Sequence, residues 1–341
     1  MKFWKMNGAG NDFIIFNNTE EKIPEADLPR IARTLCRRRL SLGADGLIVV
    51  DAPSGQSGIL SNGLFASGGF SDAPDRKAPA RVNEGLFASY SLSGMSDSRR
   101  NTDQSGMNNA GSGNLKRNES ADFRMLFFNA DGSPGEMCGN GARCVCRYGY
   151  ETGLSGSVQR VETAAGLVTG ERIDQRNYKI KLNNPSVIRP SGKIEIDGAS
   201  YSCAYVELGE PGVPHALVPY PDLKNADENA LRELGRKIRW HSDFPKGANV
   251  NFYEFTGEDI LYEKTFERGV EDFTLACGTG TGSLVSVLTL TGQVSGKQVR
   301  VDMAGGRLII DAEQDDGKIT ALYLTGPTNL VAKGEIFDEE L

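Results

Sequence analysis

Apolar positions in the first 50 residues fall in short runs that glycine-rich turns separate. Segments 2–6, 13–16 and 47–50 are apolar or alternating and have the length of strands. Between them, apolar residues recur at helical spacing and predict a helix over about 26–39. The chain therefore opens with strands on both sides of a helix.

The rest of the chain, outside residues 53–122, continues this alternation. A strand is predicted over 123–128, and a helix follows Cys138 and extends through Tyr148. Further strands are predicted over 158–163, 167–171, 178–182, 201–208, 250–255, 260–266, 299–301, 308–311 and 321–324, and further helices over 229–239 and after Cys277. Each half thus offers strands, a Cys-Gly-x-Gly turn and a helix, which predicts an α/β (α+β) fold of two pseudo-equivalent units.

Residues 53–122 differ in composition from the remainder. They are rich in Ser, Gly and Asn, poor in Val and Ile, and contain a short repeat, in which residues 63–67 return as 85–89. Such a segment buries too little apolar surface to offset the entropy lost on ordering. We interpret it as a disordered or loosely ordered insertion that the fold tolerates, in preference to a binding module.

Charge and composition exclude several classes of partner. The 341 residues carry 38 Lys and Arg against 45 Asp and Glu, a net charge of −7, which disfavours nucleic acid and anionic membrane surfaces. No run approaches the ~18 apolar residues of a membrane span. The first residues lack the pattern of a signal peptide, so a cytoplasmic location is expected.

Two of the six cysteines stand out by their context. Cys138 and Cys277 each precede a predicted helix and are followed by glycines, in Cys-Gly-Asn-Gly and Cys-Gly-Thr-Gly. A helix N-terminus carries partial positive charge and free N–H groups, which is expected to lower the thiol pKa. The glycines would let a carboxylate approach those N–H groups. A lone Cys-Gly pair is more often a buried cysteine beside a turn, but the second matching motif favours a functional interpretation.

Two such turns facing each other suit inversion at an amino-acid Cα. One thiolate would take the proton from one face while the other thiol delivers a proton to the opposite face. This chemistry requires neither a metal nor a pyridoxal cofactor, and none is predicted. A zinc site from Cys138, Cys144 and Cys146 is disfavoured because the spacing lacks a C-x-x-C pair, and a redox pair is disfavoured for the same reason.

Around these cysteines the sequence resembles the diaminopimelate epimerase family. The resemblance covers the chain outside about 53–122 and rests on ordered motifs: Lys5-Met6-Asn7-Gly8-Ala9-Gly10-Asn11-Asp12-Phe13, Gly43-Ala44-Asp45-Gly46, Phe128-Asn129-Ala130-Asp131-Gly132-Ser133, Met137-Cys138-Gly139-Asn140-Gly141-Ala142-Arg143-Cys144, Pro214-His215, Asn249, Glu267-Arg268-Gly269 and Ala276-Cys277-Gly278-Thr279-Gly280.

The resemblance implies two similar domains, each a curved sheet or roll around a central helix, with the active site in the cleft between them. The first would comprise residues 1–183, including the insertion, completed by 328–341, and the second 184–327. It also implies interconversion of LL- and meso-2,6-diaminopimelate in lysine and peptidoglycan precursor synthesis, and a homodimer.

The resemblance further implies a set of site residues. Cys138 and Cys277 would be the acid/base pair, and His215 and Glu267 would tune their pKa values. The expected substrate contacts are Asn11, Asn129, Gly139, Asn140, Asn249, Glu267, Arg268, Gly278 and Thr279.

Three features depart from the family pattern. Val213 stands where the family has Asn in Gly-Asn-Pro-His, the stretch from Arg268 to Cys277 is one residue longer than usual, and the insertion is unusual. A related cofactor-independent racemase, acting on histidine or another single amino acid, is therefore an alternative. An inactive amino-acid-binding protein on the same fold is a second alternative, and the retained cysteine pair argues against it.

Overall fold

The computed structural model describes residues 1–54, 120–135, 138–337, 339 and 341. The prediction of an insertion over 53–122 therefore lies almost wholly outside the described residues. All described residues belong to one compact unit. Contacts thus join both halves of the chain, and the predicted division after residue 183 stays a prediction.

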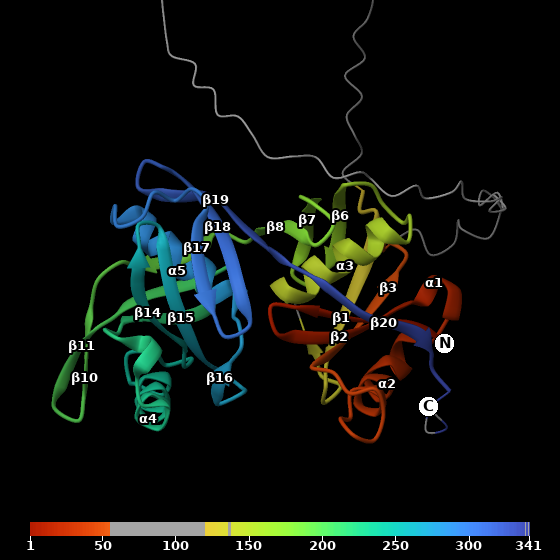
Figure 1. Ribbon diagram of the computed structural model, residues 1–341, viewed down its shortest axis with the longest axis horizontal. Coiled ribbons are helices and arrows are strands. Elements are labelled where there is room, and N and C mark those ends of the chain that lie inside the picture. Colours follow the sequence, from red (N-terminus) through yellow and green to blue (C-terminus); the bar gives the residue numbers. More distant parts are fainter. Residues whose placement is uncertain (55–119, 136–137, 338, 340) are drawn as a thin grey trace, which may run out of the picture. The chain divides into compact units, whose positions relative to one another are not determined.

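Most strands of the described residues form one hydrogen-bonded sheet (Figure 1). In the first half these are β1 (Lys2–Gly8), β2 (Asn11–Asn17), β3 (Gly46–Asp51), β4 (Phe123–Asn129), β5 (Pro134–Gly135), β6 (Val158–Thr163), β7 (Gly166–Arg172) and β8 (Asn177–Leu182). The second half holds β9 (Pro185–Arg189), β12 (Ala204–Leu208), β13 (Val213–Pro219), β14 (Asn249–Gly257), β15 (Ile260–Glu267), β16 (Asp272–Thr274), β17 (Val299–Met303), β18 (Gly306–Asp315) and β19 (Lys318–Pro327), followed by β20 (Asn329–Glu335).

The strand pairing is the same in both halves. Antiparallel β1–β2, parallel β2–β3, antiparallel β3–β4 and parallel β4–β6 are matched by β12–β13, β13–β14, β14–β15 and β15–β17. Strands β20 and β9 add to β1 and β12, and β8 pairs with β19. We call β1–β8 the first repeat and β12–β19 the second. This confirms the predicted mixed α+β fold with two pseudo-symmetric halves.

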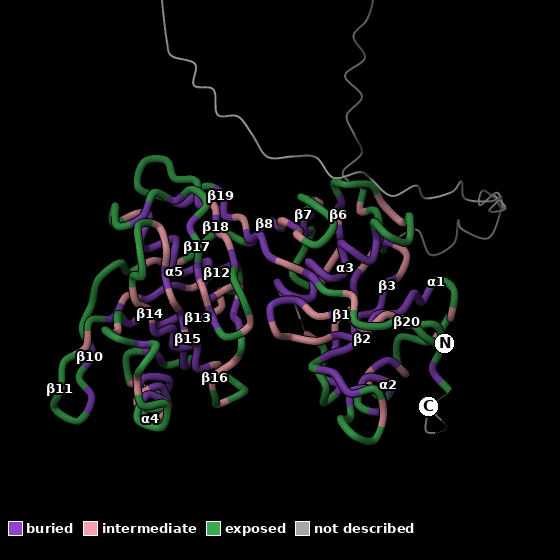
Figure 2. The backbone as a smooth tube through the Cα atoms, in the orientation of Figure 1, coloured by how far each residue is buried: buried purple, intermediate pink, exposed green. Residues whose placement is uncertain are grey.

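Each repeat holds one buried helix against its strands (Figure 1). Helix α3 (Gly139–Glu151) contacts β1, β7 and β8, and α5 (Gly278–Leu290) contacts β12, β18 and β19. Both helices are buried along most of their length (Figure 2). Because apolar side chains surround both helices, α3 and α5 share the largest apolar core of the described residues.

A second pair of helices packs on the other face of the strands. Helix α2 (Leu28–Leu35), which follows the 3-10 turn η1 (Glu25–Asp27), shares a core with β2 and β3. Helix α4 (Glu228–Arg239) and the turn η2 (Leu223–Asn225) share a core with β13 and β14. The short α1 (Asn18–Glu21) follows β2. None of the helices among the described residues is long and apolar enough to cross a bilayer.

Two predicted elements differ from the structure. The helix predicted over 26–39 is α-helical only over Leu28–Leu35, because its first turn is the 3-10 turn η1 and the chain leaves the helix after Cys36. The strand predicted over 201–208 is broken at Cys203. Before that residue, β11 (Ala199–Ser202) pairs with β10 (Lys193–Ile196) in a separate hairpin, whereas after it β12 pairs with β9 and β13.

Candidate active site

The two cysteines occupy equivalent positions with nearly the same backbone conformation. Cys138 is the N-cap residue of α3 (φ −127°, ψ 116°), and Cys277 is the N-cap residue of α5 (φ −126°, ψ 101°). Backbone N–H groups of the first turn approach each thiol, from Asn140 and Gly141 in α3 and from Gly280 in α5. Each helix start therefore presents a thiol beside unpaired backbone donors, as the sequence predicts.

One leucine of β19 joins the two turns. A Cβ atom built on Gly139 would lie 3.2 Å from Leu324 Cδ2, and one built on Gly278 would lie 2.9 Å from that same carbon. The glycines after the two cysteines therefore face each other across a single methyl group. The structure brings together two motifs that are 139 residues apart in the chain (138 to 277).

Glu267 acts electrostatically on both thiols. Its charge raises the pKa of Cys138 and also that of Cys277. Burial raises the pKa of Glu267 itself, and the nearby Thr274 hydroxyl opposes this in part. A single carboxyl at the end of β15 is thus within reach of both candidate bases.

The expected lowering of the two thiol pKa values is wrong for this structure. Burial raises the pKa of Cys138 and of Cys277, and it outweighs the backbone N–H groups that favour the thiolates. Thr279 Oγ1 lies 3.5 Å from Cys277 Sγ and adds a further favourable contact. Helix-end donors are present as predicted, but the sequence does not show how completely the thiols are removed from water.

Two of the remaining cysteines lie inside α3. Cys144 and Cys146 are buried in α3, where burial raises the pKa of each to about 12. Across the described ranges, no three His, Cys, Asp or Glu side chains come together as a metal-binding group. The zinc alternative for Cys138, Cys144 and Cys146 therefore lacks the geometry it needs.

A hydrogen-bonded chain of side chains holds the first turn of α3. Asn140 Nδ2 donates to Asn11 Oδ1 at 2.6 Å, and Arg143 Nη2 donates to Asn140 Oδ1 at 2.7 Å. Arg143 is fully buried, its Nη1 bonds the Gly139 carbonyl at 3.2 Å, and burial lowers its pKa to about 10. This buried cation lowers the pKa of Cys138. Sequence reasoning missed Arg143, although it lies within the Cys138 motif.

In the second repeat, the predicted contacts Asn249 and Arg268 are joined. Asn249 Oδ1 accepts the Arg268 backbone N–H at 2.8 Å, and Arg268 Nη1 donates to the Lys246 carbonyl at 3.3 Å. Asn129 lies at the position in β4 that Glu267 holds in β15, and its side chain bonds Ser133 Oγ at 2.9 Å. Their contacts with a substrate stay predictions.

His215 is a buried, neutral histidine. Burial lowers its pKa to about 3, with a smaller contribution from the charge of Arg268. Its Nδ1 lies 3.1 Å from Asn251 Nδ2, and its Nε2 has no hydrogen-bond partner among the described residues. Because Asn251 offers an N–H to Nδ1, the remaining ring proton belongs on Nε2. The role of His215 in tuning a thiol pKa stays a prediction.

The strands beneath the two helix starts differ sharply in polarity. A Cβ on Gly141 of α3 would meet Ile48 and Met125, whereas the equivalent Gly280 of α5 meets Asn251. In the second repeat, Thr281 of α5 bonds Glu263, which occupies the place of Met125. Cys138 therefore stands above apolar strands, and Cys277 stands above a polar, hydrogen-bonded surface.

Glu263 is a carboxyl group that the sequence analysis did not single out. It is 1% exposed, its Oε2 lies 2.6 Å from Thr281 Oγ1, and its Oε1 has no partner in the described part of the chain. Thr281 Oγ1 also lies 2.9 Å from the Cys277 carbonyl oxygen. A hydroxyl has one proton, so it satisfies both oxygens only when Glu263 donates its own proton. Burial raises the pKa of Glu263 to about 8, in agreement with a protonated group.

Replacing Glu263 with Gln is expected to change how stability depends on pH. The carboxyl keeps its proton in the folded state up to about pH 8, whereas the unfolded chain loses it near 4.5. The folded state therefore binds more protons in this window, and wild-type stability falls as pH rises from 4.5 through 8. In the wild type, this decrease in the free energy of unfolding is on the order of 3–5 kcal/mol, and it should be absent in E263Q. Urea unfolding of both proteins at pH 5, 7 and 9 measures this, and parallel curves would contradict it.

A small cavity opens beside the Cys277 turn. Its volume is about 180 Å³, and it is lined by Ala164, Ala165, Asn183, Leu208, Glu210, Pro211, Val213 and Thr279. Asn11 holds the place of Val213 in the first repeat. There the β1–β2 turn packs closely instead, since a Cβ on Gly10 would lie 2.6 Å from Leu275 Cβ. Free space adjoins the site at Val213, the position that departs from the family pattern.

Comparison with protein families matches residues 98–188 and 209–331 to the diaminopimelate epimerase model. The diaminopimelate epimerase of Aquifex aeolicus is 32% identical over 351 residues, covering 100% of this chain and 99% of that protein. The enzyme of the same name from Leptospira biflexa is 34% identical and covers 65% of this chain and 82% of that protein.

Solved structures support the fold at lower sequence identity. A hydroxyproline epimerase from Agrobacterium vitis, with bound trans-4-hydroxy-L-proline, has a TM-score of 0.59 and 16% identity, covering 99% of this chain and 92% of that one. A methylitaconate-delta-isomerase has a TM-score of 0.56 and 13% identity, with coverage of 98% and 94%. At these identities the likeness concerns the fold.

Proposed function

The chain belongs to the diaminopimelate epimerase family, and from this premise we propose that it interconverts LL- and meso-2,6-diaminopimelate by two-base proton transfer at Cα. The observation that carries the proposal is the meeting of the two cysteine turns across Leu324. No other pair of cysteines among the described residues occupies two helix starts. This reaction belongs to lysine and peptidoglycan precursor synthesis.

The two helix starts supply the parts that such a reaction needs. The substrate α-carboxylate would be held by the backbone N–H groups of the first turns of α3 and α5, where Gly139 and Gly278 carry no side chain. One thiolate removes the Cα proton, the negative charge spreads onto the carboxylate that these donors hold, and the opposite thiol returns a proton. The product leaves the two thiols with their protonation states exchanged.

Burial, and to a smaller degree the charge of Glu267, makes the two thiols hard to ionise. The site contains Glu267 and two buried thiols, and the buried cation described within it is Arg143. A substrate α-ammonium group adds positive charge beside the thiols and offsets Glu267. Substrate binding is thus expected to promote thiolate formation in a site that otherwise disfavours it.

Proton exchange in D₂O tests the proposed reaction. LL-diaminopimelate and a panel of single amino acids that includes histidine are incubated with the reduced enzyme, and deuterium at Cα is followed by NMR and mass spectrometry. Deuterium in diaminopimelate, together with meso product, is the expected result. Exchange confined to another amino acid would assign a related racemase, and no exchange with any compound would favour the inactive binding protein.

Val213 offers a test of where the distal end of the substrate lies. V213N should place an amide beside the cavity that Val213, Glu210 and Thr279 line. If the distal polar group reaches this cavity, one added hydrogen bond should lower KM for diaminopimelate about five- to tenfold, with kcat little changed. Steady-state kinetics measures this, and V213L is the control that adds no polar group. An unchanged or higher KM for V213N would place the distal end elsewhere.

We further propose a cytoplasmic homodimer that works without metal or organic cofactor. The family resemblance supports the dimer, and the net charge of −7 agrees with a small-molecule substrate in place of nucleic acid or membrane. Sedimentation at micromolar concentration tests the dimer. Full activity after prolonged dialysis against EDTA tests independence of metal.

A further inference from the structure

The two repeats differ where the later turns of α3 and α5 cross their strands. Trp4 pairs with Ile15 in β1–β2, and Ala204 pairs with Leu217 at the equivalent place in β12–β13. Tyr148 and Val287 are likewise equivalent, because each stands ten residues after its cysteine. A tryptophan and a tyrosine in the first repeat thus correspond to an alanine and a valine in the second.

In the first repeat, the aromatic rings of Trp4 and Tyr148 fill the space between α3 and β1. The Trp4 and Tyr148 rings meet edge to face, with centroids 4.9 Å apart and an interplanar angle of 73°. Lys333 of β20 lies over the indole, with Nζ 3.5 Å from the ring centroid. An indole, an aromatic neighbour and a cation therefore complete the packing of α3.

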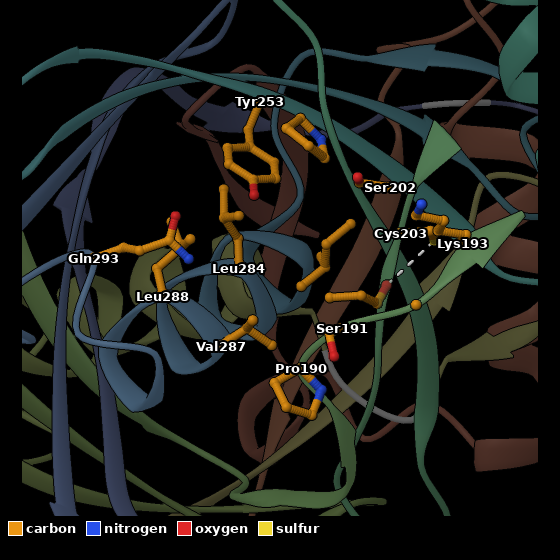
Figure 3. A pocket seen from close by; sticks show the side chains of 14 residues that line it. Pro190, Ser191, Lys193, Ser202, Cys203, Tyr253, Leu284, Val287, Leu288 and Gln293 are labelled. Carbon is orange, nitrogen blue, oxygen red and sulfur yellow. Dashed lines mark hydrogen bonds between the residues drawn. The ribbon is translucent and has the colours of Figure 1, made fainter. Parts of the chain in front are cut away.

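In the second repeat, the smaller side chains leave a cavity of about 440 Å³ (Figure 3). Leu284, Val287 and Leu288 of α5 form one wall, and Tyr253 of β14 lies next to Leu284 (Figure 3). Ala204 is also part of the lining. This volume is within the range of small-molecule sites, about 300–1,000 Å³.

The described residues that line the cavity also include polar side chains and a cation, Lys193. The polar groups that line it are Ser191, Lys193, Ser202 and Gln293 (Figure 3). None of the described residues that line the cavity is an Asp or a Glu. Lys193 thus provides positive charge beside an apolar wall, as Lys333 does beside Trp4 in the first repeat.

We propose that this cavity binds a small planar aromatic molecule, of the size of indole, that carries an anionic substituent. In the first repeat, the indole of Trp4 and the cation of Lys333 complete the packing of α3. The second repeat has an apolar wall on α5 and the cation of Lys193, but it has no aromatic ring at the position of Trp4. The cavity is separate from the thiol site, because its α5 residues begin at Leu284, well after Cys277. Binding here is independent of the proposed substrate.

Methyl NMR on the full chain tests the proposal with indole and indole-3-acetate as probes. We expect saturable shifts of the Leu284, Val287 and Leu288 methyl groups below about 5 mM probe. Indole-3-acetate should bind at least about threefold more tightly than indole, and K193Q should remove that difference. No saturable shift, or shifts confined to other methyl groups, would overturn the proposal. Shifts of these methyl groups with protein concentration alone, without probe, would overturn it in favour of a second copy of the chain.

A filling variant provides the complementary measurement. A204W rebuilds the indole of the first repeat inside the cavity, so it should weaken binding of both probes at least about tenfold and raise the melting temperature. Turnover at the thiols should be unchanged. A199W, which adds the same side chain on β11 outside the cavity, is the matched control and should bind normally. Unchanged affinity for both probes in a cooperatively folded A204W would overturn the proposal. If A204W does not fold, the methyl shifts of the wild-type protein with the two probes decide the question.

Discussion

Alanine at either Cys138 or Cys277 is expected to reduce epimerisation of diaminopimelate by about 10³-fold or more. Each thiol is proposed to serve one face of Cα, and loss of one positioned acid or base typically costs 10²–10⁴-fold. The N-cap positions tolerate the change structurally, because neither thiol caps its helix through a side-chain hydrogen bond. Folding should therefore be retained while turnover is lost.

The two cysteine variants should also differ in which epimer of diaminopimelate still exchanges its Cα proton. The thiol that remains can still exchange the Cα proton of the epimer whose hydrogen it faces, so C138A and C277A should each incorporate deuterium into a different epimer without inversion. NMR of both epimers in D₂O measures this, and C36A is the control because Cys36 is buried in the C-cap of α2. Inversion by either variant at a rate near that of wild type would remove the two-thiol mechanism.

Alanine at Gly280 is expected to damage both stability and catalysis. A Cβ there would overlap the side-chain oxygen of Asn251 and would lie 3.3 Å from Cys277 Sγ. Asn251 has little freedom to move, because its amide bonds His215 Nδ1 at 3.1 Å and its oxygen accepts from Thr265 at 3.0 Å. Overpacking of this kind costs about 1–3 kcal/mol, and displacement of a reacting group by about 1 Å can cost 10²-fold in rate.

Urea unfolding and kcat/KM of G280A measure the two effects. G156A is the matched control, because a Cβ on Gly156 meets no atom within 4 Å. G156A should be indistinguishable from wild type in both measurements. If G280A keeps wild-type stability and rate, the contact between the first turn of α5 and Asn251 does not position Cys277.

The local features of the candidate site were predictable from the sequence. Cys-Gly-x-Gly before an apolar periodic run indicates a helix start, and both cysteines have the extended N-cap conformation that such a start requires. The repeat of strands and helix in each half was visible for the same reason. The strand order was not, because hydrophobic periodicity shows that strands exist but does not show their partners.

The sequence did not reveal features that depend on what a side chain packs against in the folded protein. Asn251 alternates with apolar residues along β14, and Glu263 and Thr265 flank Lys264 in a polar stretch of β15, so the sequence is equally compatible with solvated positions. Only the packed structure shows that these side chains lie beneath α5. The same limit applies to Arg143, whose charge suggests exposure but which is fully buried.

The contact of Gly139 and Gly278 with Leu324 has a consequence for how the two repeats diverge. Trp4 and Ala204 occupy equivalent positions of the two repeats, as do Met125 and Glu263. At these positions the side chain of one repeat differs from that of the other without direct effect on the other repeat. At Leu324 this freedom ends, because a Cβ added at Gly139 or Gly278 would push the methyl group that the other glycine also faces. The two cysteine turns are therefore expected to change together, because a substitution in one turn that displaces Leu324 also changes the surroundings of the other turn.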